Sequence, residues 1–466
     1  MTAGLAERRA VRTVLPVPEP DLTPAELIAR AAALKPLLRQ QQAENDERGF
    51  YSQELHQAFL DAGLYRTLQP RMFGGYEFDV PTFYRAMLEI SHGHPSAGWC
   101  LTLCASHPFL IASHWSERAQ RELFGPDGDF AAPHRVPPAG MLRPAEGGYR
   151  LTGLWDFCSG IPHSTHLVCG ARLPAADGPP EVFCVAVPRE KLRILDDWGG
   201  DRTLGMRASG SHSVEIKDAF IPAHHAVPLQ GLFTRPEDMR DGTPGTQLHG
   251  NPMYLGRVAG PYHMSLITPV IGAAKAALDE YQDIICTKNT NFPPIVPRAE
   301  HEDFQRALGQ ATILTDAAEN LMIRGGEVYM EMCERWASDG TLITVEQNLR
   351  LWAMLQQAGR MACDAVELLF KERRHLGGAQ RQPHGAVPAR CANVSRASLV
   401  FVRELLGAGR PRASRIADPA LQLLAHIAFE LTHSPLIPAQ AGIQIESAKI
   451  AINQLGPRFR GDERRE

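Results

Sequence analysis

The chain contains 466 residues, of which 44% are hydrophobic, and this is enough apolar material for a buried core and two or three structural units. Its 48 basic and 52 acidic residues give a formal net charge of -4. A charge this small excludes strong electrostatic attraction to nucleic acid or to an anionic membrane, so we expect small-molecule partners.

The N-terminal quarter of the sequence predicts helices. The first 20 residues lack the apolar stretch of a signal peptide, so we expect a cytoplasmic protein. Thr23 followed by Glu26 is a capping-box signature at the start of a long helix. Amphipathic or apolar periodicity then predicts three more helices, the last of them buried on most sides, at residues 52–68, 81–94 and 96–115.

The periodicity changes in the second quarter. Short alternating runs between about residues 130 and 228 are separated by Gly, Pro and Asp, which predicts a compact antiparallel β domain. Long amphipathic helices return after residue 240, and the last has one apolar face made of Leu351, Leu355, Ala358, Ala362, Ala365 and Leu369. Helices of this length predict a bundle with an oligomeric interface.

These elements predict an α+β fold in three parts. They are an N-terminal helical domain at 1–125, a central β domain at 126–240 and a C-terminal helical bundle at 241–371. No GxGxxG or P-loop joins a strand to a helix, and hydrolase motifs are incomplete. The nine cysteines form no CxxC pair, no apolar run could span a membrane, and we predict free thiols. No carboxylate or thiol pattern accompanies the histidine pairs, so we predict no metal site at His163, His166, His224 and His225.

Four strings, in this order, carry a resemblance to a known family. They are AGLYRTLQPRMFGGYE, SHGHPSAGWC, GYRLTGLWDFCSG and LGMRASGSHSVEIKDAFIP, and the resemblance covers roughly residues 20–370. The chain resembles the acyl-CoA dehydrogenase fold, and within it the oxygenase components of two-component flavin-dependent monooxygenases that act on hydroxyphenylacetate and phenolic steroid fragments. This implies an acyl-CoA dehydrogenase-like homotetramer. It also implies reduced FMN or FAD from a separate flavin reductase, O2, and an aromatic substrate that is hydroxylated through a C4a-hydroperoxyflavin.

The resemblance places GYRLTGLWDFCSG against the flavin. A flavin ring is a flat apolar plate with a polar edge, so Trp155 and Phe157 are expected to form its wall, with Cys158 beside them. Ser159 is expected to offer its hydroxyl and backbone N–H to the N5 region, because Gly160 allows close approach. The alternative is that Ser159 only satisfies a turn.

Three further site residues are implied by the resemblance. A buried His107 with a pKa near neutrality would accept the phenolic proton, Trp99 would line the same pocket, and Arg207 would lie near the flavin or its phosphate. The alternatives are a core histidine bonded to a backbone carbonyl, a core tryptophan and an exposed arginine. One departure from the family pattern, His134 and Arg135, is expected to change what the pocket accepts.

The sequence after Phe370 loses its helical period and becomes rich in Arg, Gly, Pro and His. With codons chosen freely, a one-base shift permits another translation of this stretch, which resembles the C-terminal motif of the family. We therefore expect a frameshift near Lys371, with residues 372–466 out of frame or disordered and the second family histidine absent. The alternative is a genuine lineage-specific extension.

Two other functions stay open at this point. An acyl-CoA dehydrogenase needs a carboxylate base, and the positions after the last in-frame helix offer none in either frame, so we rank this function second. An inactive remnant that still binds flavin is the third.

Overall fold

The computed structural model describes residues 13–199, 202–203, 205–229, 239–256, 261–291 and 293–375, with backbone only at 261–265 and 371–375. The chain divides into two compact units. The first comprises residues 1–174 and 181–408 and contains the helices and strands named below; the second comprises 175–180 and 409–466. The sequence predicts that the helical period ends at Phe370, but the last helix continues to His375. The rest of the predicted frameshifted tail, from residue 376 onward, lies outside the described residues and stays a prediction.

The N-terminal part is helical, as predicted, but the long helix expected after Thr23 is divided into two helices at Leu34, where a proline stands at the start of the second. Its helices are α1 (Pro24–Ala33), α2 (Lys35–Arg48), α3 (Gln53–Asp61), α4 (Val80–Gly93), α5 (Pro95–His114) and α6 (Glu117–Phe124). The capping box is confirmed, because the Glu26 amide donates to the Thr23 hydroxyl at 3.2 Å and the Thr23 amide donates to the Glu26 carboxylate at 2.9 Å. Every residue of α5 is buried except Trp99 and His114, which confirms the expected buried helix.

Seven strands form one mixed sheet in the order β5-β6-β2-β1-β3-β4-β7. They are β1 (His134–Ala145), β2 (Gly148–Trp155), β3 (His166–Leu173), β4 (Glu181–Pro188), β5 (Arg193–Ile194), β6 (Val214–Pro222) and β7 (Ala226–Pro228). One pair departs from the predicted antiparallel arrangement, because β1 and β3 are parallel. The chain turns back once after β1 and again after β2, so β3 lies beside β1 in the same direction.

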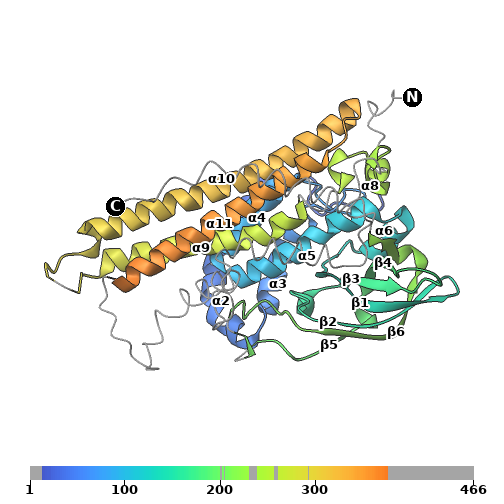
Figure 1. The fold of residues 1–466 in the computed structure, drawn as a ribbon, viewed down its shortest axis with the longest axis horizontal. Helices are drawn as coiled ribbons and strands as arrows, with labels where there is room; N and C mark the ends of the chain where they lie inside the picture. Colours follow the sequence, from blue (N-terminus) through green and yellow to red (C-terminus); the bar gives the residue numbers. More distant parts are fainter. Residues whose placement is uncertain are drawn as a thin grey trace, which may run out of the picture. The chain divides into compact units, whose positions relative to one another are not determined.

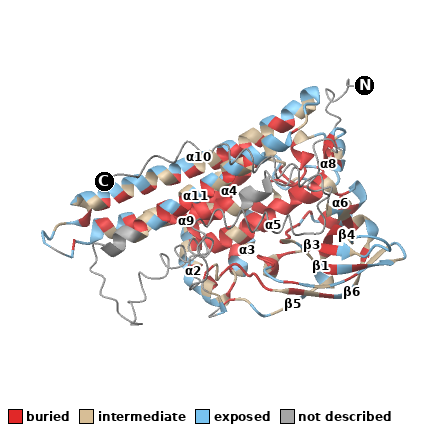
Figure 2. Cartoon of the chain, in the orientation of Figure 1, coloured by how far each residue is buried: buried red, intermediate tan, exposed pale blue. Residues whose placement is uncertain are grey.

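Three long helices follow the sheet: α9 (Pro261–Thr287), α10 (Glu302–Asp339) and α11 (Val345–His375). The shorter α8 (Pro244–His249) precedes them. The apolar face predicted for α11 is buried at all six positions. Figure 2 shows exposed faces along α10 and α11, while α5 is buried along its length. Among the described residues, no helix combines the length and apolar character that crossing a membrane requires.

Helix α5 is central to the positioning of the candidate site. It packs against α4 and α9 on its helical side and contacts β1 of the sheet (Figure 1). The order of helices, strands and helices is the predicted one, while the domain boundaries at residues 125, 240 and 371 stay a prediction. A buried helix between two layers is the place where side chains from all three parts can meet.

Candidate functional site

The turn after β2 is tied to a second segment, residues 206–212. The Cys158 amide donates to the His212 carbonyl at 3.1 Å, and the Gly160 amide donates to the Ser209 carbonyl at 2.9 Å. Gly160 has a φ of 85°, in the left-handed region where a residue with a side chain is strained. These bonds hold the end of GYRLTGLWDFCSG against the start of GSHSVEIKDAFIP.

Helix α5 closes this turn from the other side. A Cβ at Gly160 would lie 2.7 Å from the Cys104 sulfur, and the Cys100 thiol donates to the Ser209 carbonyl at 2.9 Å. Both cysteines are buried, as predicted for core thiols, and burial raises the pKa of each well above its usual value. Their thiols therefore stay protonated and pack rather than react.

Three serine hydroxyls form a buried chain at this junction. Ser159 Oγ lies 2.7 Å from Ser211 Oγ, which lies 2.6 Å from Ser209 Oγ. Three hydroxyls carry three hydrogens, and these two bonds use only two of them, so one hydrogen at this chain is left to donate elsewhere. Sequence reasoning missed Ser209 and Ser211, although both stand in the quoted string that ends the β domain.

The backbone N–H predicted to serve the flavin has another partner. The Ser159 amide donates to the Phe157 carbonyl at 3.0 Å, so in this structure only the hydroxyl of Ser159 remains for a ligand. Both expectations for Ser159 therefore apply, one to its amide and the other to its hydroxyl. The amide satisfies the turn, and the hydroxyl enters the chain with Ser211.

The predicted aromatic wall separates into a buried and an exposed ring. Trp155 is fully buried in the sheet core, its indole N–H donates to the Gly170 carbonyl at 3.0 Å, and Gly140 and Gly153 leave room for its ring. This geometry gives Trp155 a place in the core, so its contact with flavin stays a prediction. Phe157, by contrast, is 57% exposed.

Phe157 and Cys158 occupy opposite sides of the turn. The Phe157 ring meets the ring of Trp198 edge-on at a centroid distance of 6.0 Å, so two aromatic side chains gather there. The Cys158 thiol points inward, where burial raises its pKa to about 12. A flat ligand at this turn would therefore contact Phe157, while Cys158 supports it from within.

His107 is buried one helical turn beyond Cys104 on α5. Its Nδ1 lies 2.6 Å from the Ala132 carbonyl and must donate to it, so Nε2 carries the lone pair of the neutral ring. Burial lowers the pKa of His107 to about 4. The expectation of a pKa near neutrality is therefore wrong, because the sequence does not show how completely the ring leaves water. The carbonyl contact expected of a core histidine is present.

The two residues that depart from the family pattern lie in the same region. The His134 ring stands perpendicular to the His107 ring at a centroid distance of 5.3 Å. Arg135 donates from Nη2 to the Asp156 carboxylate at 2.8 Å and from Nε to the Asp156 carbonyl at 2.9 Å. His134 therefore neighbours the predicted substrate histidine, and Arg135 braces the turn after Trp155.

A polar face of α2 was not recognised from the sequence. Gln42 and Asn45 are buried, and together with Asp46 they follow the i, i+3, i+4 spacing of one helix face. The Gln42 amide atoms, Asn45 Nδ2 and Asp46 Oδ1 are buried without a hydrogen-bond partner among the described residues. The helical spacing of Gln, Asn and Asp is the sequence signal that could have revealed this face. Buried polar atoms of this kind usually have partners, so the face suits a polar ligand.

Arg207 joins this polar face. Its charge opposes the effect of burial on Asp46, whose pKa is raised to about 6, mainly by burial. Arg207 Nε is likewise buried without a partner among the described residues, and its carbonyl accepts the Trp198 indole N–H at 3.2 Å. The Gly210 amide donates to the Gly49 carbonyl at 2.8 Å, which links the end of α2 to the serine chain.

The residues present fit a flavin. The hydroxyl chain leaves one hydrogen to donate to the polar edge of the ring, and Phe157 offers an apolar face. The guanidinium of Arg207 suits either the pyrimidine carbonyls or a phosphate. Trp99 is partly buried and packs against the helical core, so its predicted contact with the substrate stays a prediction.

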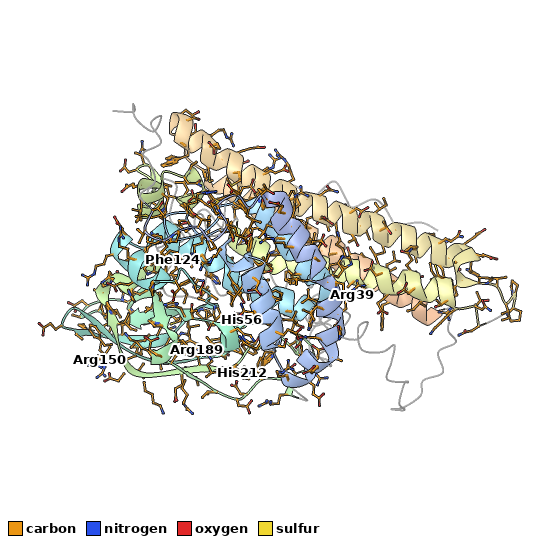
Figure 3. All side chains as sticks on the ribbon, turned by 180° about the vertical axis from the view of Figure 1, so that it is seen from behind. Arg39, His56, Phe124, Arg150, Arg189 and His212 are labelled. Carbon is orange, nitrogen blue, oxygen red and sulfur yellow. The ribbon has the colours of Figure 1, made fainter. Side chains whose placement is uncertain are left out.

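Stacked rings join α3 to the turn that follows Gly160. His163 stacks on His56 at 4.6 Å and on Tyr51 at 4.5 Å, and its Nε2 lies 2.8 Å from the Tyr51 carbonyl. Figure 3 labels His56 on the N-terminal helices, and Arg189 and His212 on the segments that connect the strands. The stack fixes the turn from outside the site.

Comparison with known proteins supports the predicted resemblance. Residues 264–379 match the family described as acyl-CoA dehydrogenase, C-terminal domain. The oxygenase subunit HsaA of a flavin-dependent monooxygenase from Rhodococcus jostii (strain RHA1) is 28% identical over 252 residues, which are 54% of this chain and 63% of that subunit. The oxygenase component of an FADH(2)-dependent resorcinol hydroxylase from Rhizobium sp. (strain MTP-10005) is 27% identical over 321 residues, 66% of this chain and 74% of its own length.

Solved structures share the fold. XiaF from Streptomyces sp., in complex with FADH2 and glycerol, superposes with a TM-score of 0.71 at 23% identity and covers 89% of this chain and 97% of its own. TdsC from Paenibacillus sp. A11-2, with FMN and indole, gives a TM-score of 0.67 at 18% identity and covers 87% and 97%. The acyl-CoA dehydrogenase-like fold and the resemblance to oxygenase components of flavin-dependent monooxygenases are therefore confirmed.

Proposed function

We propose that this protein is the oxygenase component of a two-component flavin-dependent monooxygenase that hydroxylates a phenolic or other aromatic small molecule. The observation that carries the proposal is the buried chain of Ser159, Ser211 and Ser209, which meets the exposed Phe157 turn and α5 at one junction. The relatives support it, since they are named as oxygenase components acting on resorcinol and p-hydroxyphenylacetate.

The proposed reaction balances without another oxidant. One atom of O2 enters the aromatic ring as a hydroxyl group, the other leaves as water, and two electrons and two protons come from reduced flavin. Reduced FMN or FAD, when bound, supplies those electrons, and a separate flavin reductase delivers it. Solved structures of relatives with FADH2 and with FMN support both cofactors.

The residues of this chain then have distinct roles. The remaining hydroxyl hydrogen of the serine chain donates to the polar edge of the flavin from Ser159, Phe157 and Trp155 shape the wall with Cys158 behind them, and Arg207 binds the pyrimidine or a phosphate. The buried side chains of Cys100, Cys104 and Ser159 exclude water from the inner side of the junction, while Phe157 leaves its outer side open.

His107 and Trp99 line the proposed binding site for the aromatic substrate. With a pKa near 4, His107 is neutral at pH 7. A phenol has a pKa of about 10, so complete proton transfer to this ring is unfavourable in the ground state. His107 instead accepts a hydrogen bond from the phenolic hydroxyl at Nε2, which orients the substrate and draws electron density toward the ring.

The test is a single-turnover assay of the full chain. Anaerobically reduced FMN or FAD is bound, ¹⁸O2 is added with resorcinol, p-hydroxyphenylacetate or indole, and products are analysed by mass spectrometry. We expect one ¹⁸O atom per hydroxylated product. Reduction of oxidised flavin by an acyl-CoA, with no oxygen transfer, would instead identify a dehydrogenase. Flavin binding with neither reaction would identify an inactive remnant.

A matched pair of serine variants tests the site. Ser159→Ala should weaken reduced-flavin binding or oxygen transfer at least tenfold, because the hydroxyl chain loses its end. Ser113→Ala is the control, since Ser113 is also buried but donates to the Phe109 carbonyl within α5. Equal behaviour of the two variants would remove Ser159 from the proposal.

We also propose a cytoplasmic homotetramer. The cysteines that the structure describes are free thiols, and all but Cys286 are buried, which suits a reducing compartment. Ile313 on α10 and Val345 and Leu349 at the start of α11 are exposed, which suits helix packing between subunits. Gel filtration with light scattering measures the assembly.

A further inference from the structure

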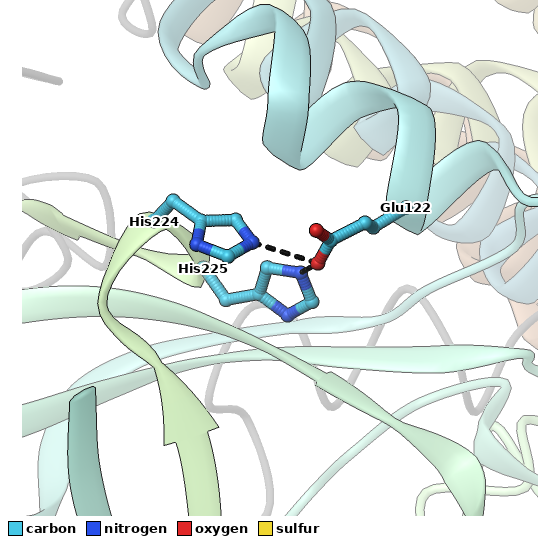
Figure 4. A group of neighbouring side chains, drawn as sticks. All are labelled: Glu122, His224 and His225. Atoms are coloured by element: carbon cyan, nitrogen blue, oxygen red, sulfur yellow. Dashed lines mark hydrogen bonds and ion pairs between the residues drawn. The ribbon is translucent and has the colours of Figure 1, made fainter. Parts of the chain in front are cut away.

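A second group of chemistry-bearing side chains lies outside the candidate site. The sequence shows no carboxylate beside His224 and His225, but the structure brings Glu122 to them from α6 (Figure 4). Glu122 Oε2 lies 2.7 Å from His224 Nε2 and 3.0 Å from His225 Nε2. One oxygen therefore faces two imidazole nitrogens.

Local structure aims these side chains at one point. His224 and His225 end a short 3-10 turn after β6, and their rings are nearly perpendicular at a centroid distance of 4.9 Å. The His225 carbonyl accepts the indole N–H of Trp115 at 3.1 Å, and Arg118 Nε donates to the other Glu122 oxygen at 3.2 Å. The backbone turn and the carboxylate are thus held independently.

We propose that Glu122, His224 and His225 bind a divalent transition-metal ion, with Zn²⁺ the best match. One ligand atom from each of the three lies within 4.8 Å of the others. Ligand atoms around one tetrahedral Zn²⁺ lie about 3.3 Å apart, because each metal–ligand distance is about 2.0–2.1 Å. Glu122 Oε2 lies 2.7 Å and 3.0 Å from the two histidine nitrogens, so these atoms need to move apart only slightly to admit the ion.

The donor set selects the class of metal. Two imidazole nitrogens and one carboxylate oxygen suit Zn²⁺, Ni²⁺ or Cu²⁺, whereas Mg²⁺ and Ca²⁺ prefer oxygen alone. Three protein ligands leave a fourth position for water. His225 is buried, but Glu122 is exposed and His224 is partly exposed, so an ion can enter from solvent.

The ion would stabilise the fold rather than take part in the oxidation. Along β6, Val214 pairs with Trp155 at the flavin end, while Pro222, which precedes the histidine turn, pairs with Gly148 at the other end. The strand has nine residues, so roughly 25–30 Å separates the two ends. A metal here would join α6 to the end of β6.

The experiment uses the full chain after removal of any affinity tag and of bound metals by a chelator. Co²⁺ is titrated as a spectroscopic probe, because tetrahedral Co²⁺ absorbs visible light strongly, and Zn²⁺ is then used to displace it. We expect one Co²⁺ per chain, displaced by one Zn²⁺, and a higher unfolding temperature with Zn²⁺.

Two variants and one control separate metal binding from folding. His224→Ala and Glu122→Gln should weaken Co²⁺ affinity at least tenfold and abolish the Zn²⁺ effect on unfolding. Glu122→Gln can still accept hydrogen bonds from Arg118 and the histidines, so its metal-free form should remain folded. His301→Ala, which removes a histidine near Asp303 on α10, should bind as the wild type does. No saturable Co²⁺ binding, or equal binding by all variants, would overturn the site.

Discussion

Asp46 is the ionisable residue of the polar α2 face, and its replacement by Asn gives a quantitative test of that face. Burial raises the pKa of Asp46 from 3.8 to about 6, against the opposing charge of Arg207. A difference of about two pKa units corresponds to about 3 kcal/mol between the two protonation states. The ionised carboxylate therefore costs up to about 3 kcal/mol of folding free energy at neutral pH. Asp46→Asn keeps the shape and removes the charge, so we expect about 1–3 kcal/mol of added stability at pH 7.5.

The pH dependence has a definite sign. The folded pKa lies above the unfolded value, so between about pH 4 and pH 6 the folded protein binds more protons at Asp46 than the unfolded chain does. The wild-type free energy of unfolding therefore falls as pH rises through that window. The advantage of Asp46→Asn should be absent near pH 4, should grow through the window and should stay constant above about pH 7.

Urea denaturation of the metal-free, flavin-free protein at a series of pH values measures this difference. Glu47→Gln is the matched control, since Glu47 is the next residue of α2 and is exposed, so its charge should contribute less than about 0.5 kcal/mol. The reasoning is refuted if Asp46→Asn is less stable than the wild type at pH 7.5. It is also refuted if the difference is the same at pH 4, because the cost of burying the carboxylate would then not be its origin.

Three further outcomes are expected. Gly160→Ala should lose about 2–4 kcal/mol in urea denaturation, since it combines a positive φ with a contact at 2.7 Å from the Cys104 sulfur, whereas Gly250→Ala, with positive φ and open space, should lose about 1–2. Leu355→Ala should cost about 2–5 kcal/mol because the side chain is fully buried on α11; a loss below 1 would contradict that packing. Restoring the reading frame at Lys371 should raise the yield of soluble, flavin-binding tetramer; identical behaviour of both chains, or coding DNA without a frame change, would contradict the frameshift.

Much of the fold could be predicted because periodicity reports burial. The capping box at Thr23, the buried helix from Pro95 to His114 and the apolar face of α11 follow from local pattern alone. The parallel pairing of β1 and β3 could not be predicted in this way. Strand direction depends on the path of the connection after β2, and alternation along one strand is the same for parallel and antiparallel neighbours.

Site residues could be predicted from the sequence only where they belong to a string that resembles the family. Ser159 and Ser211 each stand in one of the quoted strings, but 52 residues separate them and the α2 face lies more than 100 residues before Ser159, so no spacing rule connects them. The pKa of His107 was misjudged for a related reason. Periodicity places a residue on a helix, but it does not show that the second layer, here Ala132, covers that residue.

Backbone strain gives an independent indication that this junction is specialised. Among the described residues, four other than glycine have positive φ, and two of them, Phe157 and Met206, belong to the two segments that meet at the serine chain. Each such residue lowers the folding stability by about 1–2 kcal/mol, and local conformational propensity does not offset this loss. Trp155 holds one segment through its buried indole, and the Cys158 amide holds it to His212. The positive φ of Phe157 goes with an exposed Phe157 ring and a buried Ser159 hydroxyl two residues later, an arrangement that a regular continuation of β2 would not give, because residues i and i+2 of a strand face the same side.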